Sequence, residues 1–276
     1  MAPRSRSPAA AGRTPAASPR RSSLRAGSHR PRKRFGQHFL HDQGVVARIV
    51  GAVDPGPRDH VVEIGPGEGA LTRALHARAG RFEAIEIDRD LAAALRAEGV
   101  EVHAEDALAF DFAGLPPGTR IVGNLPYNIS TPILFRLAEH AAHFRDVHCM
   151  LQLEVVKRMV AQPSTPDYGR LSVMLQARFR MQMLFRVAAG AFRPPPKVES
   201  AVVRMLPLAE PLDRDAPGFA DLVRAAFSAR RKTLRNALGM TEAALAALGV
   251  DPGLRPENLA PQDYARIARR TISHRG

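Results

Sequence analysis

The segment Asn124-Leu125-Pro126-Tyr127 carries the residue types that could activate an aromatic amine. The amino nitrogen of adenine is a weak nucleophile because its lone pair is delocalised into the ring. Two acceptors that bind its hydrogens would free this pair: the carboxamide oxygen of Asn124, and the carbonyl of Leu125, which faces no N–H from Pro126. Tyr127 can stack on the base. The pattern predicts attack of an adenine amino group on a methyl carbon, although these residues could also form a turn without chemistry.

A glycine-rich segment at residues 61–72 is typical of a strand, a tight turn and the start of a helix. Gly65 and Gly67 would let the backbone approach a ligand closely and present amides at a helix N-terminus. Together with Ala70 they also satisfy the dinucleotide fingerprint. The loop alone therefore allows an NAD-dependent oxidoreductase, or a turn that binds nothing, as well as an S-adenosylmethionine site.

Three acidic residues bear on this choice of cofactor. Glu86 follows Gly65 by about 20 residues, where a carboxylate can accept hydrogen bonds from ribose hydroxyls. Glu63 directly precedes the glycines and favours S-adenosylmethionine, because a sulfonium and an ammonium tolerate a carboxylate that would repel a pyrophosphate. Asp106 could accept a hydrogen bond from the cofactor's adenine, or cap a loop. Transfer needs no general base, since the proton can leave to water, and we expect no metal.

The elements that must position these residues alternate between short apolar runs and helix-period segments, which is typical of a parallel α/β sheet. We expect helices over 70–79, over 91–98 and just beyond Pro132. The strands that we expect lie at residues 61–64, 82–87, 100–103, 120–123, 147–153, 183–188 and 201–206. The last two would close the sheet as a hairpin-like pair. The predicted fold class is a Rossmann-like class I S-adenosylmethionine-dependent methyltransferase with a small all-helical C-terminal domain.

Charge and composition divide the chain into three parts. Ten of the 40 Lys and Arg residues lie in residues 1–34, which hold no acid, so 30 bases and 27 acids remain for the rest. We interpret residues 1–30, rich in Arg, Ser, Ala and Pro, as a disordered basic tail. Residues 31–207 form the expected S-adenosylmethionine-binding domain. Residues 208–276 contain short helical patterns broken by Pro and Gly, and form the expected RNA-binding domain.

Composition also excludes several classes of protein. The single Cys149 allows no intramolecular disulfide and no thiolate cluster. No apolar run approaches the roughly 18 residues that span a bilayer. We expect a reducing compartment, the cytoplasm, although the basic tail also has the composition of a transit peptide. Its prolines would break the amphipathic helix that such peptides use.

The chain resembles the ribosomal RNA adenine dimethyltransferases over about residues 33–275. Six ordered landmarks carry this resemblance: residues 33–40, 63–72, 124–131, 168–172, 192–198 and 230–236. It implies dimethylation of two adjacent adenosines in the hairpin loop near the 3′ end of 16S ribosomal RNA, within the small subunit or its precursor, by a monomer that uses S-adenosylmethionine.

The resemblance also implies site residues. Asn124 to Tyr127 would hold the target adenine, with Phe192 as a second aromatic wall. The residues expected at the cofactor are His38, Leu40, Gly65, Gly67, Glu86, Asp106 and Asn124. Two alternatives stay open: the 23S ribosomal RNA resistance methylases, which share these motifs, and a non-catalytic assembly factor on the same scaffold.

The basic stretch at residues 227–238 argues for the small-subunit enzymes. We expect Arg224, Arg231 and Arg235 on one stripe of a helix. This stripe would border an apolar stripe of Val223, Phe227, Leu234 and Leu238. The predicted phosphate contacts are Arg224, Arg230, Arg231, Lys232 and Arg235. A solvated charged face is the alternative interpretation.

Overall fold

The computed structural model describes residues 37–272. The basic tail at residues 1–30 and the first part of the landmark at 33–40 lie outside the described residues. A seven-stranded sheet forms the centre, in the order β4-β3-β2-β5-β6-β9-β7. Its strands are β2 (His60–Ile64), β3 (Arg81–Ile85), β4 (Glu101–His103), β5 (Thr119–Asn124), β6 (Phe144–Gln152), β7 (Phe179–Val187) and β9 (Ser200–Pro207). All seven expected strands are confirmed within a few residues.

The first five strands of the sheet are parallel, whereas β9 pairs antiparallel with both β6 and β7. The chain passes from β2 through β3 to β4 at one edge, then returns to β5 on the other side of β2. Open α/β sheets bind ligands at such a reversal, beyond the carboxyl ends of the strands. The Rossmann-like fold class is confirmed.

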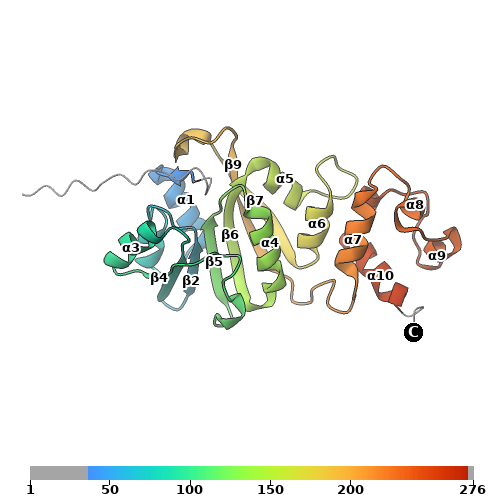
Figure 1. The fold of residues 1–276 in the computed structure, drawn as a ribbon, viewed down its shortest axis with the longest axis horizontal. Coiled ribbons are helices and arrows are strands. Elements are labelled where there is room, and N and C mark those ends of the chain that lie inside the picture. Colours follow the sequence, from blue (N-terminus) through green and yellow to red (C-terminus); the bar gives the residue numbers. More distant parts are fainter. Residues whose placement is uncertain (1–36, 273–276) are drawn as a thin grey trace, which may run out of the picture. The chain divides into compact units, whose positions relative to one another are not determined.

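Helices cover both faces of the sheet (Figure 1). One face packs against α1 (Gln43–Val53), α2 (Thr72–His76) and α3 (Arg89–Ala97), and the other against α4 (Ser130–Glu139), α5 (Leu153–Val160) and α6 (Arg170–Gln176). Because central strands are covered on both faces, almost every residue of β6 is buried, including the polar Asp146 and His148.

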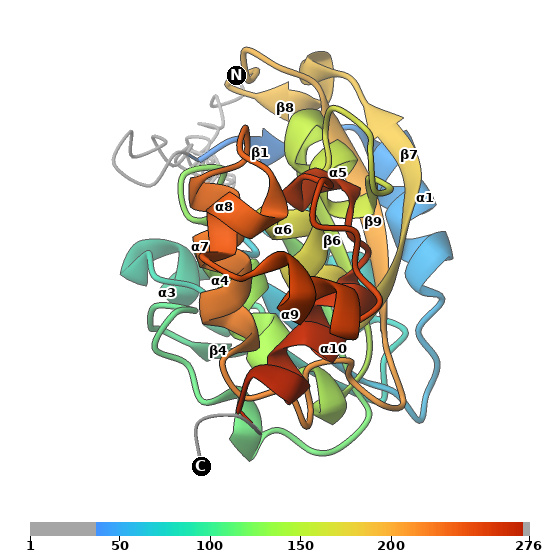
Figure 2. The same ribbon diagram turned by 90° about the vertical axis from the view of Figure 1, so that its right-hand side faces the viewer.

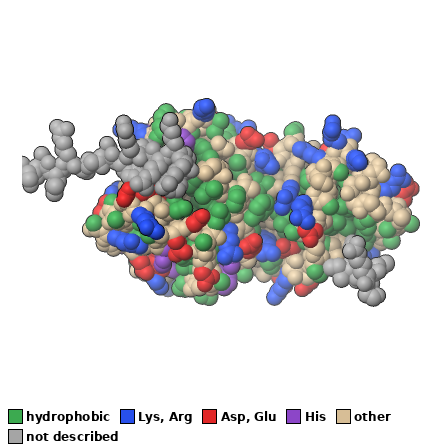
Figure 3. Space-filling model, viewed as in Figure 1, with side chains coloured by type: hydrophobic (Ala, Val, Ile, Leu, Met, Phe, Trp, Pro, Cys, Tyr) green, Lys and Arg blue, Asp and Glu red, His purple; other side chains and the backbone are tan. Residues whose placement is uncertain are grey.

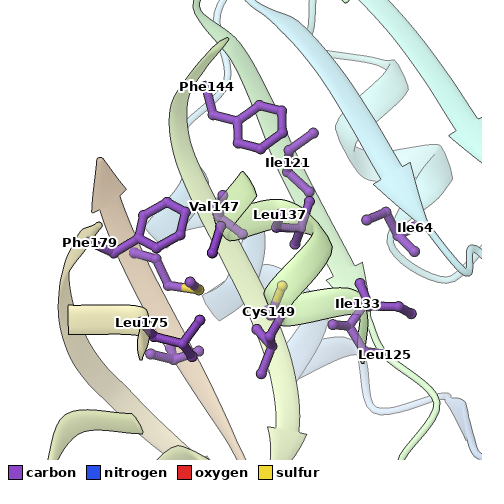
Figure 4. Packing of buried hydrophobic residues seen from close by; sticks show 14 of the residues in the cluster. Ile64, Ile121, Leu125, Ile133, Leu137, Phe144, Val147, Cys149, Leu175 and Phe179 are labelled. Carbon is purple, nitrogen blue, oxygen red and sulfur yellow. The ribbon is translucent and has the colours of Figure 1, made fainter. Parts of the chain in front are cut away.

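The apolar cluster under α4 reaches the end of the sheet where the chemistry is expected. Figure 4 shows Ile64 and Leu125, which stand at the ends of β2 and β5, in the same cluster as Ile133 and Leu137 of α4. Burying a side chain of this size stabilises the fold by roughly 1.5–3 kcal/mol. The residues that flank the two central strands are therefore held by the core.

After β9 the described chain is helical, with α7 (Phe219–Ser228), α8 (Leu234–Leu238), α9 (Glu242–Ala247) and α10 (Pro261–Ile272). Figure 2 shows these helices grouped together. They share an apolar core with Tyr168 and with Val173 of α6. The Tyr168 hydroxyl donates to the carbonyl of Leu259 at 2.8 Å. A domain boundary at 208 stays a prediction, because the helices pack on residues that precede β9.

A small second sheet joins distant parts of the sequence. The two-residue strands β1 (Phe39–Leu40) and β8 (Phe192–Arg193) pair antiparallel. Neither strand is visible in the sequence, because two residues leave no alternating pattern. Their pairing brings the segment that follows residue 36 beside the loop that leads into β9.

Candidate active site

A cavity opens at the carboxyl ends of β2 to β5, where the strand order reverses. Its wall combines the 37–40 segment, the glycine loop and the ends of three strands. The residues that line it are Gln37, His38, Phe39, Leu40, Glu63 to Glu68, Ala70, Leu71, Ile85, Glu86, Ile87, Glu105, Asp106, Ala107, Asn124 to Ile129 and Ile133. All the residues predicted to contact the cofactor therefore lie around one cavity.

The glycine loop needs glycine for two physical reasons. Gly65 and Gly67 have φ angles of 69° and 58°, in the left-handed region that side chains rarely adopt. A Cβ atom on Gly67 would also lie 2.9 Å from a ring carbon of Phe39. The loop and the 37–40 segment thus touch at the floor of the cavity, with no room for a larger residue.

Glu86 organises this loop from the end of β3. One carboxylate oxygen accepts the amide of Gly67 at 3.1 Å, and the other accepts the amide of Asp88 at 2.9 Å. Burial raises the pKa of Glu86. A carboxylate has about four acceptor positions, so Glu86 can still accept a hydrogen bond from a ribose hydroxyl group.

Glu63 is a second acid in the cavity wall and is only 1% exposed. The hydroxyl of Thr72 donates to it at 2.6 Å. Burial, with a smaller contribution from the neighbouring Glu86, raises the pKa of Glu63 to about 7. A cationic ligand beside this acid would favour its ionised form.

Asp106 and Ile87 also line the cavity. One oxygen of Asp106 accepts the amide of Leu108 at 2.9 Å, so this residue caps its loop as well as lining the cavity. The side chain of Ile87 is 43% exposed.

Asn124 is oriented by the backbone of the 37–40 segment. Its amide nitrogen donates to the main-chain oxygen of His38 at 3.0 Å, which leaves the carboxamide oxygen as the acceptor. The amide of Leu125 donates to Met150 at 3.2 Å. Within residues 37–272, no main-chain hydrogen bond ends on the carbonyl oxygen of Leu125. Both acceptors proposed for an amine are therefore available.

Tyr127 follows directly and contacts two other segments. Its hydroxyl lies 2.6 Å from the hydroxyl of Ser200, and its ring centroid lies 5.4 Å from that of His38. Burial raises the pKa of Tyr127. A ring nitrogen of His38 is in turn 2.8 Å from the carbonyl oxygen of Pro194.

Phe192, predicted as the second wall of the base pocket, is 1% exposed and belongs to the core between the sheet and α1. It lies in β8, opposite Leu40, rather than among the residues that line the cavity. Its role at the base stays a prediction.

Sequence reasoning missed Ser200 and Thr72 as partners of site residues. A Ser or Thr that bonds a residue far along the chain leaves no spacing signal, because the contact depends on the tertiary fold. Thr72 is the exception that could have been found, since the segment from Glu63 to Thr72 forms one strand-turn-helix unit.

The expectation of one helix that carries Arg224, Arg231 and Arg235 on a single stripe is wrong. Helix α7 ends at Ser228, and α8 begins only at Leu234. Leu234 is fully buried, and its amide donates to Leu254 at 2.6 Å. In a continuous helix this amide would bond to the carbonyl of Arg230, four residues earlier, so its bond to Leu254 interrupts the helical pattern here.

The basic residues themselves are exposed around this turn. Figure 3 shows Lys and Arg side chains over the part that the C-terminal helices occupy. Three of them contact acids: Arg224 with Asp221, Arg230 with Glu257, and Arg235 with Glu242. Among residues 37–272, no carboxylate lies within 4.0 Å of Arg231 or Lys232. These two cations are the ones most open to phosphates.

One group of side chains in the described part of the chain has metal-ligand character: Glu83, Glu101 and His103. The carboxylate of Glu83 already lies 2.7 Å from His103, 2.8 Å from His60 and 2.7 Å from Arg81. Bound hydrogens of these three groups satisfy it, and the group lies outside the cavity lining. It therefore acts as an ion cluster that ties β2, β3 and β4 together.

The fold, the glycine loop and the acid at the end of β3 define a Rossmann-like S-adenosylmethionine-dependent methyltransferase. The model of the family described as "Ribosomal RNA adenine dimethylase" matches residues 28–272. The chain belongs to this family, and its cofactor is S-adenosylmethionine.

Curated relatives span nearly the same length. A "Ribosomal RNA small subunit methyltransferase A" of Chromobacterium violaceum is 56% identical over 249 residues, which are 87% of this chain and 95% of that protein. A protein of the same description from Thiobacillus denitrificans is 57% identical over 247 residues, 87% of this chain and 97% of that protein.

Two solved structures share the fold. A dimethyladenosine transferase from Plasmodium falciparum is 26% identical, with a TM-score of 0.76 over 86% of this chain and 98% of that one. The 23S rRNA methyltransferase ErmE is 31% identical, with a TM-score of 0.65 over 84% of this chain and 98% of that one.

No described helix is both long and apolar enough to cross a membrane.

Proposed function

We propose that the chain dimethylates the N6 amino groups of two adjacent adenosines in the 3′-terminal hairpin loop of 16S ribosomal RNA, late in assembly of the small subunit. The single observation that carries the chemistry is the fixed carboxamide of Asn124. Its donor end is engaged by His38, so its acceptor end and the carbonyl of Leu125 are presented together beside the glycine loop.

In this proposal the cavity has a cofactor half and a base half. His38, Leu40, Gly65, Gly67, Glu86 and Asp106 surround the cofactor, and Asn124 stands between the two halves. S-adenosylmethionine supplies a methyl group on a positively charged sulfur. Glu86 would accept from the ribose hydroxyls, Asp106 from the adenine amine, and Ile87 would cover one face of that ring.

The protein's own residues then orient the target amine. Asn124 and Leu125 each accept one of its hydrogens, which directs the nitrogen lone pair toward the methyl carbon. Bound S-adenosylmethionine would supply the methyl group to this nitrogen, and the amine proton would then leave to water. Tyr127 holds the base by stacking. A target inside a helix must first be turned out of its stack.

The second methylation of the same base places a different demand on the site. The monomethylated amine has one remaining hydrogen, so one of the two acceptors binds it while the new methyl replaces the other contact. Since both acceptors are neutral, either can lose its hydrogen bond without leaving an unpaired charge, which supports a site that completes dimethylation.

The small subunit is preferred as substrate because the curated relatives that match at more than 50% identity are small-subunit methyltransferases. The basic turn after α7 supports the same choice, with Arg224, Arg230, Arg231, Lys232 and Arg235 available for the RNA backbone. We also propose that the protein is a monomer in the cytoplasm. Sedimentation of the purified chain would test the monomeric state, and cell fractionation would test the location.

The deciding experiment offers both ribosomal subunits from cells that lack the modification, with a labelled methyl donor. We expect label in dimethyladenosines of the 16S 3′ hairpin, mapped by mass spectrometry of nuclease fragments. Label confined to large-subunit RNA would transfer the proposal to the 23S methylases. No label in either subunit from a folded, donor-binding protein would overturn methyl transfer to ribosomal RNA.

A further inference from the structure

Ser200 lies behind the base half of the cavity without lining it. It opens β9, is fully buried, and its hydroxyl oxygen is 2.6 Å from the hydroxyl of Tyr127. Tyr127 lines the cavity, whereas Ser200, which contacts the Tyr127 hydroxyl, is not among the lining residues. The pair joins the end of β5 to the start of β9, 73 residues further along the chain.

The backbone of Ser200 is a fixed point in the sheet. Strand β9 lies between β6 and β7, and Ser200 pairs with Gln152 on one side and with Val187 on the other. A residue in register with two neighbouring strands has little freedom to move. Its hydroxyl therefore gives the Tyr127 side chain a rigid partner rather than a flexible one.

A second contact restrains the same ring along its face. The ring of His38 lies 5.4 Å from that of Tyr127, at an interplanar angle of 32°. His38 is itself held, since a ring nitrogen is 2.8 Å from the carbonyl oxygen of Pro194. The tip of the Tyr127 ring is thus fixed by Ser200 and one side by His38, so the orientation of the ring is determined by two independent contacts.

We propose that Ser200 is a positioning residue for the methyl transfer, which fixes the tip of the Tyr127 ring and so, together with His38 on one side of the ring, the surface on which the target adenine stacks. The inference rests on the proposed function. Stacking sets where the purine plane lies, and hence the angle at which the amino nitrogen meets the methyl carbon. A small rotation of the ring would carry the amine away from Asn124 and reduce the fraction of productive complexes.

The first test compares Ser200→Ala, Tyr127→Phe and the double variant. We expect Ser200→Ala to lower kcat for methyl transfer to small subunits by roughly tenfold, with the Kd for S-adenosylmethionine within about twofold of wild type. Because Tyr127→Phe removes the same hydrogen bond, the double variant should be no slower than Tyr127→Phe alone. Losses that multiply in the double variant would overturn the proposal.

The second test reads the hydrogen bond directly, by titrating tyrosine absorbance at alkaline pH. The chain has three tyrosines and no tryptophan. Tyr168 and Tyr264 are fully buried and donate to main-chain carbonyls, and burial raises the pKa of both well above the ordinary range. The first transition therefore belongs to Tyr127.

Burial raises the pKa of Tyr127, and the bond from Ser200 opposes that shift by stabilising the phenolate. Ser200→Ala should therefore move the first transition to higher pH. A variant that merely loosens the structure would expose the phenol and move the transition the other way, toward the value of a free tyrosine. That second result would overturn a positioning role.

Ser172→Ala is the matched control. Ser172 is also fully buried, and its hydroxyl donates to the main-chain oxygen of Arg158 outside the cavity. It should lower the melting temperature without changing kcat or the tyrosine titration. If wild type transfers no methyl groups, the proposed function fails; if wild type is active and Ser200→Ala matches it, the positioning role alone fails.

Discussion

The cavity at the carboxyl edge of the sheet and the basic turn between α7 and α8 are built in different ways. In the cavity, main-chain groups hold the functional side chains: the amide of Gly67 binds Glu86, and the carbonyl of His38 binds Asn124. At the turn, exposed cations meet exposed acids or solvent. The cavity presets the geometry of a reaction, whereas the turn presets little beyond charge.

Asn124→Ala should break the cavity most severely. It removes one of the two acceptors for the amine and the contact to His38, and loss of one such preorganised group typically costs roughly 100- to 1,000-fold in kcat. We expect methyl incorporation into small subunits to fall by at least about 100-fold, measured with a tritiated donor.

Asn258→Ala provides a control for this variant. Asn258 accepts from the amide of Arg255 and lies outside the cavity. It should lower the melting temperature slightly and leave incorporation intact. An Asn124→Ala protein with near wild-type incorporation would contradict the role of the carboxamide.

Gly67→Ala should weaken cofactor binding. A methyl group at this position would meet Phe39 at 2.9 Å, and the backbone conformation disfavours any side chain. Strain of this kind costs roughly 1–3 kcal/mol, so we expect the Kd for S-adenosylmethionine to rise by about 10- to 100-fold, measured by calorimetry.

The matched substitution Gly51→Ala falls within α1, where an added Cβ meets nothing within 4 Å. It should stabilise the protein by roughly 0.5–1 kcal/mol and leave the Kd unchanged. Equal Kd values for both variants would mean that the loop is not the cofactor cradle.

Glu63 should make cofactor binding depend on pH. Burial raises the pKa of its carboxyl to about 7, and the ionised form complements a cationic donor better than the neutral form. Because protonation then competes with the donor, affinity should fall by about tenfold from pH 8 to pH 6. Calorimetric titrations across this range would measure the change.

Two controls separate Glu63 from its neighbour Glu86, whose pKa burial also raises. Glu63→Gln removes one acid and leaves Glu86 in place, and it should make cofactor affinity nearly independent of pH. S-adenosylhomocysteine, which lacks the sulfonium charge, should show a weaker dependence with wild type. A profile that stays steep in Glu63→Gln would assign the dependence to Glu86 instead.

The sequence was informative where function follows from local geometry. Gly65 and Gly67 follow strand β2 and precede a helix, and Asn124 ends β5, which lies beside β2. The fold class alone therefore places the glycines and Asn124 at the same edge of the sheet. The contacts of His38 and Ser200 could not be predicted, because they join segments that only the folded chain brings together. The break between α7 and α8 was missed because the helical spacing of apolar residues continues through it, whereas the amide of Leu234 bonds to the distant carbonyl of Leu254.

The basic turn gives the smallest predicted effect and the most direct test of the comparison. Arg231 and Lys232 have no carboxylate within 4.0 Å in the described part of the chain, whereas Arg224 and Arg235 contact Asp221 and Glu242. A free cation can neutralise a phosphate in full, whereas a cation already paired with an acid is partly neutralised and contributes less to the salt dependence.

Replacing Arg231 and Lys232 together by Ala should therefore weaken binding of small subunits by about fivefold at moderate salt and reduce the salt dependence, with the slope of log K against log salt shallower by about 1.5. The double variant Arg224→Ala, Arg235→Ala removes the same charge and should change the slope less. Filter binding across a salt series would compare them. At saturating substrate, kcat should be unchanged in both variants, because neither touches the cavity. Equal slopes would mean that charge alone, wherever it lies on this turn, determines RNA binding.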